Sequence, residues 1–330
     1  MKIVIPMAGF GTRLRPHTWS KPKPLVSVAG KPVLGHVLDM FSNLPDIDEV
    51  IFIVGYLGEQ IESYVGDAYG HLPARYVVQD EMLGQSHAIW LAREGLEGPM
   101  FMVFVDTLIE TDLSILPNET AGAVAWVHEV DDPRRFGVAE VGEDGWVRRL
   151  VEKPQDKSNN LAVVGFYYFR QAEALIAAIE KQMEQGDDLG GEFYLADAIN
   201  VMLTDGLEMR TESVQIWKDC GKVDALLDTN RYLLDHGRDN SAEAQHRAEA
   251  LILPPVFIDP SAEIAHSVIG PNVSVGAGCI IQNSIVRDSI IENDASIENA
   301  LLEESLVGRN ARISGKFKLV NVGDTSQVDI

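Results

Sequence analysis

A basic, glycine-containing segment near the N-terminus holds the side chains best suited to chemistry. Residues 7–25 read MAGFGTRLRPHTWSKPKPL. Gly9 and Gly11 lack a Cβ, so the loop can turn sharply and bring backbone N–H groups close to an anion. Four cations lie near that loop in a chain whose formal net charge is -23, namely Arg13, Arg15, Lys21 and Lys23. The pattern indicates a polyphosphate-binding loop, and an ordinary tight turn after a first strand is the alternative.

The spacing excludes the two commonest phosphate-binding loops. A dinucleotide fingerprint G-x-G-x-x-G needs glycine at position 14, which is Leu14. A P-loop needs G-x-x-x-x-G-K-[ST], and the segment contains no such run. The chain also has no G-x-S-x-G, H-E-x-x-H or C-x-x-C motif, so nothing indicates a serine hydrolase, a zincin or a paired-cysteine site.

A second candidate segment could read a nucleobase. Residues 79–88, QDEMLGQSHA, lie between a predicted strand and a predicted helix, where ligands of α/β sheets bind. The side-chain amide of Gln79 can pair with one base edge, and Gly84 allows the backbone to approach a planar ring. A plain loop with Ser86 as a helix N-cap explains the same residues.

Acidic residues elsewhere could hold a metal ion. Asp106 follows a predicted strand, and Asp219 lies in the segment WKDCG (217–221). Two such carboxylates can hold a hard cation against ligand phosphates, although each taken singly is more often a capping or surface residue. Glu152-Lys153-Pro154 places an acid and a base side by side at the end of another predicted strand, where an exposed charged turn is the alternative.

Composition bounds the class of protein. The 330 residues favour two domains, and a hydrophobic share of 46% supplies a core. Asp and Glu number 50 against 27 Lys and Arg, which argues against nucleic acid or an anionic membrane as a partner. Two cysteines without paired spacing, no signal-peptide pattern and no apolar run of membrane-spanning length lead us to expect a cytoplasmic protein.

Apolar periodicity predicts alternating strands and helices over the first part of the chain. We expect strands at 3–5, 50–54, 75–79 and 100–105, and helices at 33–41, 58–64 and 86–93. This alternation is typical of a mostly parallel α/β sheet with ligands at the carboxyl ends of the strands. Further on we expect antiparallel strands at 124–130 and 138–150, with Gly145 in the turn, and helices at 172–185, 195–203 and 223–234.

A different pattern begins after a polar, partly helical linker at 235–249. An aliphatic residue recurs every five or six positions, at Ile258, Ile264, Ile269, Val275, Ile281, Val286, Ile291, Ile297, Leu302, Val307 and Ile313. Neither a helix nor a simple strand has this period. A hexapeptide repeat does, because each aliphatic side chain points inward at a corner of a parallel β-helix, here with about four coils of roughly 18 residues.

Taken together and in this order, the motifs resemble those of the sugar-1-phosphate nucleotidyltransferases over essentially the whole chain. Residues 7–13 with 22–25 resemble the signature A-G-G-x-G-T-R…P-K. RFGVAE (135–140), LVEKP (150–154), WKDCG (217–221), the repeats and the ending 322–330 are similar to the long form of glucose-1-phosphate thymidylyltransferase. The resemblance implies a Rossmann-like domain with a mixed, mostly parallel sheet (1–236), a linker (237–250) and a left-handed parallel β-helix (251–330).

The resemblance also implies roles for individual residues. Arg13, Lys23, Asp106 and Asp219 would be catalytic, and the two aspartates would hold Mg²⁺. The nucleoside triphosphate would be bound by Ala8, Gly9, Gly11, Thr12, Arg13, Gln79 and Gly84. The sugar 1-phosphate would be bound by Gly137, Glu152, Val163 and Tyr167, with Lys153 on its phosphate. The reaction would join dTTP or UTP to a sugar 1-phosphate, with glucose 1-phosphate favoured, and release pyrophosphate.

Departures from the family pattern leave alternatives open. Ala8 replaces a signature glycine, which is tolerable if its φ is not positive. Asp106 lies in Val-Asp-Thr where the family has Gly-Asp-Asn, and Pro24 stands where thymidylyltransferases often have glutamine, so the sequence does not separate dTTP from UTP. A non-catalytic nucleotide-sugar-binding protein, or a bifunctional enzyme with an acyltransferase β-helix around His266, are the other candidates. We expect a homo-oligomer, because a β-helix leaves an end or face that can pair.

Overall fold

The computed structural model describes residues 1–42, 44, 46–186, 190–247, 249–316 and 327. By its internal contacts the chain divides into two compact units. The N-terminal unit comprises Met1–Val26 and Pro32–Ala225, and the C-terminal unit comprises Ser27–Lys31 and Leu226–Ile330. The domain limits expected from sequence stay a prediction. Residues 322–330, which contributed to the family resemblance, lie outside the described residues apart from position 327.

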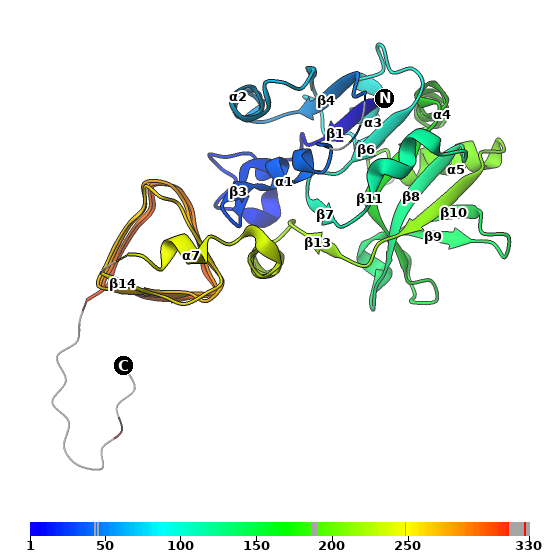
Figure 1. Ribbon diagram of the computed structural model, residues 1–330. Coiled ribbons are helices and arrows are strands. Elements are labelled where there is room, and N and C mark those ends of the chain that lie inside the picture. Colours follow the sequence, from blue (N-terminus) through cyan, green and yellow to red (C-terminus); the bar gives the residue numbers. More distant parts are fainter. Residues whose placement is uncertain (43, 45, 187–189, 248, 317–326, 328–330) are drawn as a thin grey trace. The chain divides into compact units, whose positions relative to one another are not determined.

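A nine-stranded mixed sheet forms the centre of the N-terminal unit (Figure 1). Its strands run in the order β10-β9-β11-β6-β1-β4-β5, with β8 beside β11 and β12 beside β8. Their bounds are β1 Lys2–Pro6, β4 Glu49–Val54, β5 Ala74–Val78, β6 Met100–Val103, β8 Ala123–Glu129, β9 Gly137–Val141, β10 Val147–Glu152, β11 Leu161–Phe169 and β12 Met209–Ser213. β6, β1, β4 and β5 are mutually parallel, whereas β11 is antiparallel to β6, β8 and β9.

The expected helices are present. Their bounds are α1 Val33–Asp39, α2 Gly58–Tyr69, α3 Gln85–Leu91, α4 Ala172–Gln185, α5 Leu195–Thr204 and α6 Val223–Leu233. One buried apolar cluster includes residues of α3, α4, α5 and the sheet. Leu175 and Ile179 of α4, for example, have no exposed surface. The prediction of α4 is confirmed to the residue, because its apolar positions recur at helical spacing on one face. None of the described helices is long and apolar enough to cross a membrane.

A small antiparallel ribbon lies outside the main sheet. It consists of β7 (Thr107–Ile109) and β13 (Trp217–Asp219), in which Thr107 pairs with Asp219. The predicted strand 100–105 is too long, because β6 ends at Val103 and Asp106 lies in the link to β7. The ribbon therefore brings two distant segments with aspartates side by side.

The C-terminal unit confirms the β-helix that the repeats predict. Three four-stranded parallel sheets form the sides of a triangular coil, which Figure 1 shows in cross-section. The sheets are β14 Ala250–Ile252, β17 Ser267–Ile269, β20 Ile285–Arg287 and β23 Leu301–Glu303; β15 Val256–Ile258, β18 Val273–Val275, β21 Ile290–Ile291 and β24 Leu306–Val307; and β16 Glu263–Ala265, β19 Ile280–Gln282, β22 Ser296–Glu298 and β25 Arg312–Ser314. Short helical segments, Leu234–Arg238 and α7 (Ser241–Ala244), precede them.

The predicted aliphatic positions line the interior of this coil. Nine of the eleven are buried, and Leu302 and Ile313 near its end are half-buried. Equivalent residues on successive coils are Leu251, Val268, Ile285 and Leu301, so a coil takes 16 or 17 residues. The five-residue steps in the repeat are therefore short corners, and the chain makes the four coils expected.

A short hairpin from the N-terminal part of the sequence belongs to the C-terminal unit. It joins β2 (Ser27–Val28) to β3 (Lys31–Pro32). The backbone N–H of Ser27 donates to Glu292 Oε1 at 3.0 Å, and that of Ala29 donates to Asn230 Oδ1 at 2.9 Å. Both acceptor side chains are buried. The segment that begins four residues after Lys23 is thus fixed by backbone hydrogen bonds.

Adjacent isoleucines in β19 allow a test of the coil's core. Ile281 is fully buried, whereas Ile280 points outward with 41% of its surface exposed. We expect Ile281→Ala to lower the free energy of unfolding by about 2–5 kcal/mol, because it leaves a cavity. Ile280→Ala should change it by less than about 0.5 kcal/mol. Denaturant unfolding followed by circular dichroism measures both, and equal losses would contradict the inward assignment.

Candidate functional site

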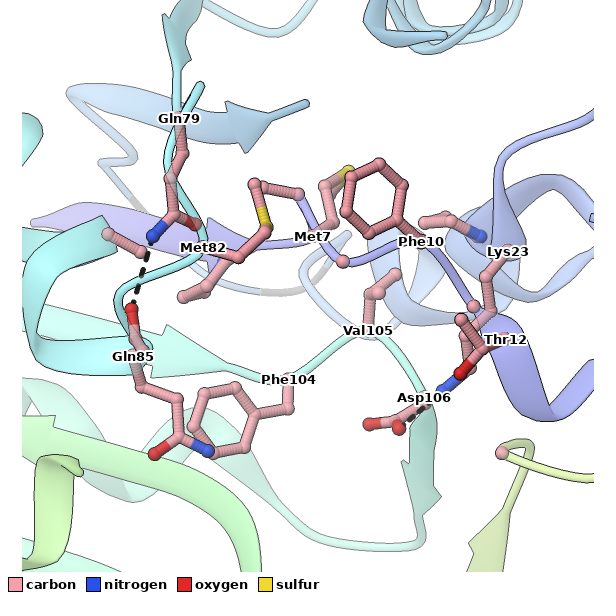
Figure 2. A pocket seen from close by; sticks show the side chains of 18 of the residues that line it. Met7, Phe10, Thr12, Lys23, Gln79, Met82, Gln85, Phe104, Val105 and Asp106 are labelled. Atoms are coloured by element: carbon pink, nitrogen blue, oxygen red, sulfur yellow. Dashed lines mark hydrogen bonds and ion pairs between the residues drawn. The ribbon is translucent and has the colours of Figure 1, made fainter. Parts of the chain in front are cut away.

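A cavity of about 480 Å³ opens at the carboxyl end of β1, a size suited to a nucleotide (Figure 2). All the residues expected to bind the triphosphate line it: Ala8, Gly9, Gly11, Thr12, Arg13, Gln79 and Gly84. Lys23 and Asp106 line it as well. Gln79 and Met82 lie toward one end in Figure 2, and Lys23 and Asp106 lie toward the other.

The glycine loop has the tight geometry expected of it. Gly11 has a φ of 60°, and a Cβ there would lie 2.9 Å from Cβ of Lys23. Thr18 Oγ1 closes the loop by donating to the Gly11 carbonyl oxygen at 2.8 Å. Ala8 is not one of the described non-glycine residues with a positive φ, so alanine is tolerated there. The loop therefore needs glycine at position 11, because the backbone passes directly against Lys23.

An ion pair lies at one end of the cavity. Lys23, at the start of a short 3₁₀ turn (Lys23–Leu25), donates from Nζ to Asp106 Oδ2 at 2.5 Å. The two side chains are only 14% and 30% exposed. Arg13 Nη2 lies 3.8 Å from the same oxygen. Burial alone would raise the pKa of Asp106, but the charges of Lys23 and Arg13 outweigh it and hold that pKa below its usual value.

Asp219 approaches the same place from β13. Its Oδ1 accepts a hydrogen bond from the Gly221 backbone N–H at 2.6 Å. A Cβ on Gly221 would lie 2.7 Å from that oxygen and 3.1 Å from Arg13 Nη2, so a larger residue there would displace these side chains. Burial raises the pKa of Asp219, and the negative charge of Asp106 raises it further. The two carboxylates therefore have shifts in opposite directions.

The donor set fits a magnesium ion. Within the described residues no group of three or more His, Cys, Asp or Glu side chains could hold a metal by itself. Mg²⁺, however, is commonly held by one or two carboxylates together with substrate phosphates. Asp106 and Asp219 line a common cavity and repel each other, which a divalent cation would relieve.

The opposite end of the first cavity has an oriented amide. Gln79 is buried, and its Nε2 donates to the Gly84 carbonyl oxygen at 3.2 Å and lies 3.3 Å from Nδ1 of His87. Among the described contacts its Oε1 has no hydrogen bond. Gly84 has a φ of 95°, and a Cβ there would lie 2.5 Å from the carbonyl oxygen of Phe193. The packing against Phe193 therefore requires glycine at position 84, whether or not a planar base also approaches it.

A second cavity of about 230 Å³ holds most of the residues expected to bind the sugar. Gly137, Glu152, Val163 and Tyr167 line it, together with Arg13, Asp106 and Asp219. Gly165 interrupts the register of β11 between Val163 and Tyr167, with a φ of 82°. A Cβ on Gly165 would lie 2.7 Å from the ring of Phe104, and that ring lines both cavities. The bulge thus makes room for the aromatic residue between them.

Glu152 and Lys153 have different surroundings. Gly137 leaves space for the Glu152 carboxylate, since a Cβ there would lie 3.2 Å from Oε2. Burial raises the pKa of Glu152 more than the neighbouring Lys153 lowers it. Lys153 Nζ lies 3.5 Å from Glu152 Oε1 and 3.3 Å from the Tyr194 hydroxyl, and Lys153 lines neither cavity. It is the one predicted site residue that the structure leaves outside them.

Several lining residues were not predicted from the sequence. They are Phe10, Met82, Gln85, Phe104, Val105, Arg135, Phe136, Glu192 and Trp217. Gln85 and Phe136 adjoin predicted site residues, and Arg135 and Trp217 begin recognised motifs, so adjacency could have indicated them. Phe104 and Glu192 carry no such signal, because only the packing of the folded chain brings them to the cavities.

The opposite pKa shifts predict opposite effects of two matched substitutions on stability. Asp219, with its raised pKa, contributes stability only when protonated, and that contribution is lost as the pH rises through its folded-state pKa. Asp106, with its lowered pKa, stabilises the fold above its unfolded pKa of 3.8 and ceases to do so in acid. At pH 7.5 in chelator, we expect Asp219→Asn to raise the free energy of unfolding by about 1 kcal/mol.

Asp106→Asn should lower that free energy by about 1–3 kcal/mol, because Lys23 loses its charged partner. Both differences should shrink as the pH falls toward 3. Denaturant titrations across this pH range measure them. Destabilisation by both substitutions to the same extent would contradict the electrostatic description of the site.

Comparison with known proteins agrees with this geometry. Residues 2–236 match the family described as Nucleotidyl transferase, and residues 252–328 match that described as GMPPB C-terminal domain. The glucose-1-phosphate thymidylyltransferase of Streptomyces antibioticus is 32% identical, over 100% of this chain and 99% of its own. A nucleotidyltransferase of low-salt glycan biosynthesis from Haloferax volcanii is 31% identical over the whole of both chains.

Among solved structures, a UDP-glucose pyrophosphorylase in complex with UDP-glucose has the same fold, with a TM-score of 0.60 and 20% identity over 71% of this chain and 98% of its own. Three observations agree: the two cavities share charged residues, the glycine loop lines one of them, and the relatives match over their full length. The chain belongs to the nucleotidyl transferase family, in the form that carries a C-terminal left-handed β-helix.

Proposed function

We propose that this protein transfers a nucleotidyl group from a pyrimidine nucleoside triphosphate to a sugar 1-phosphate in a Mg²⁺-dependent reaction. We favour dTTP over UTP and glucose 1-phosphate as the sugar. The observation that carries the proposal is the junction of the two cavities, where Arg13 and Asp106 line both. Two substrates bound there would meet at their phosphates, which is where this reaction takes place.

The chemistry requires positioning and charge neutralisation more than a covalent nucleophile. An oxygen of the sugar phosphate attacks the α-phosphorus in line, and the bond to the departing pyrophosphate breaks. Lys23 and Arg13 would face the triphosphate from the glycine loop and stabilise its developing charge. Mg²⁺ held by Asp106 and Asp219 would add positive charge to the phosphate oxygens.

Gln79 supports the choice of base. The carbonyl oxygen of its amide can accept from the N3–H of thymine or uracil, whereas N3 of cytosine has no hydrogen. It senses neither the thymine methyl group nor the ribose 2′-hydroxyl. Pro24 lines the cavity and occupies the sequence position at which thymidylyltransferases often have glutamine. The preference for dTTP over UTP therefore rests on the similarity to thymidylyltransferases.

Pyrophosphate release with a panel of triphosphates and sugar 1-phosphates tests the proposal. The panel should include dTTP, UTP, CTP, ATP and GTP, each with glucose, galactose, mannose and N-acetylglucosamine 1-phosphates, with and without chelator. We expect turnover with dTTP or UTP and its loss with chelator. No turnover of folded protein with any pair would favour a non-catalytic nucleotide-sugar-binding protein.

The homo-oligomeric state and the cytoplasmic location expected from the sequence stay predictions.

Removal of either member of the ion pair should abolish most of the activity. We expect Lys23→Ala and Asp106→Asn each to lower kcat by at least about a hundredfold, because each removes a charge at the reacting phosphates. Steady-state pyrophosphate release measures the loss. Lys181→Ala is the control, since it removes an exposed lysine paired with Asp205. Losses of less than a few-fold in both site variants would overturn the assignment.

Replacement of the buried amide should affect the nucleotide alone. Gln79→Met keeps the length of the side chain but removes the acceptor, so we expect KM for dTTP and UTP to rise by about 10- to 100-fold. The preference over CTP should narrow, and KM for the sugar 1-phosphate should stay constant. Initial rates with one substrate varied at a time measure these values. A rise confined to the sugar would contradict base recognition by Gln79.

A further inference from the structure

Two neighbouring arginines, Arg134 and Arg135, differ in whether their side chains are paired. They end a short 3₁₀ turn, Pro133–Arg135. Arg134 is tied to Asp132 by two hydrogen bonds, at 2.8 Å from Nε and 2.6 Å from Nη2. Arg135 lines the cavity, is exposed, and has no ion pair or side-chain hydrogen bond to any residue that the structure describes. Its guanidinium is therefore available to a ligand.

The charge balance of this cavity calls for such a cation. Three carboxylates line it, those of Asp106, Glu152 and Asp219. Arg13 also lines it but lies 3.8 Å from Asp106, and Lys153 lies outside it beside Glu152. Lys23 lies 2.5 Å from Asp106, so Lys23, Arg13 and Lys153 all lie within ion-pair distance of these carboxylates. Arg135 is the cation among the described lining residues that is not within ion-pair distance of a carboxylate.

The backbone on both sides of Arg135 is fixed. Pro133 sets φ at the start of the turn, and Asp132 Oδ1 caps it by accepting from the Arg134 backbone N–H at 3.3 Å. After it, the Phe136 ring packs edge-on against Trp217 at 4.8 Å. The Phe136 carbonyl oxygen accepts from the Lys153 N–H at 3.0 Å. The arginine is therefore presented from a defined position.

We propose that Arg135 binds the phosphate of the sugar 1-phosphate and so selects a phosphorylated acceptor. A guanidinium can hold two phosphate oxygens at once, which a lysine ammonium cannot do with the same geometry. This assignment rests on the proposed function, which names a sugar 1-phosphate as the acceptor. The role that the family resemblance gives to Lys153 stays a prediction beside it, and Lys153 Nζ lies 3.5 Å from Glu152 Oε1.

Equilibrium binding separates this assignment from turnover. Glucose 1-phosphate is titrated calorimetrically into the full-length protein with Mg²⁺ and a non-hydrolysable α,β-methylene analogue of dTTP. The variants are Arg135→Ala, Arg135→Lys, Lys153→Ala and, as the matched control, Arg134→Ala. We expect Arg135→Ala to weaken glucose 1-phosphate by at least about tenfold and Arg135→Lys to weaken it less.

Arg134→Ala should stay within about twofold of the wild type, because it removes only an exposed pair. KM for the triphosphate should be unchanged in Arg135→Ala. Equal affinities of Arg135→Ala and the control would overturn the assignment, as would loss of binding in Lys153→Ala alone. A fall in kcat without loss of affinity would also overturn it.

The result distinguishes this inference from the proposed reaction. Weakened binding in Arg135→Ala, in a protein that turns over no substrate pair, supports the role of Arg135 and overturns the reaction. Turnover by the wild type with unaltered binding in Arg135→Ala overturns the role and leaves the reaction standing. A wild-type protein that binds no sugar 1-phosphate overturns both.

Discussion

The site depends on one ion pair between residues far apart in the sequence. Lys23 and Asp106 meet at 2.5 Å, and each is largely withdrawn from water. Gly11 is needed for this approach, because its backbone passes against Cβ of Lys23. A half-buried pair of this kind gains little net stability, since desolvation offsets much of the attraction. Its significance is positional: it fixes a cation and a carboxylate at the place where the two cavities meet.

The second carboxylate gives this pair its chemical consequence. Asp106 has its charge balanced by Lys23 and Arg13, whereas Asp219 is half-buried, accepts a hydrogen bond from the Gly221 backbone N–H, and has its pKa raised by burial and by the charge of Asp106. A triphosphate that engages Lys23 would weaken its hold on Asp106 and leave two carboxylates facing each other. Binding of the anion and of a divalent cation should therefore be mutually favourable, because each compensates the charge that the other leaves exposed.

Local patterns in the sequence predicted the parts of the fold that local physics determines. The glycine loop, α4 and the inward aliphatic residues of the coil follow from backbone freedom or from periodicity, and the structure has them where expected. The strand β11 was not predicted, although the apolar, β-branched and aromatic run at 161–169 is typical of a buried strand. Gly165 and Phe104 illustrate the harder case: neither is informative alone, and their contact exists only once β11 pairs with β6.

Long-range packing also determined what the site prediction left out. The grouping of Ser27–Lys31 with the coil depends on Asn230 and Glu292, about 200 residues or more further along the chain. Arg135 begins the motif RFGVAE and Arg134 precedes it, but the motif does not show that Arg134 is paired with Asp132 or that Arg135 lines a cavity. The charge of a residue is visible in a sequence, whereas its partner is a property of the fold.

The residues predicted to bind the base and those predicted to bind the sugar come from different halves of the sheet. Gln79 follows β5 in the parallel half, whereas Gly137, Glu152, Val163 and Tyr167 come from β9, β10 and β11 in the antiparallel half. The residues common to both cavities include the charged residues Arg13 and Asp106 and the aromatic residue Phe104. If the residues bind as proposed, a substitution near Gln79 would change the choice of base and leave the sugar site intact, whereas a substitution at a residue that lines both cavities would affect both substrates.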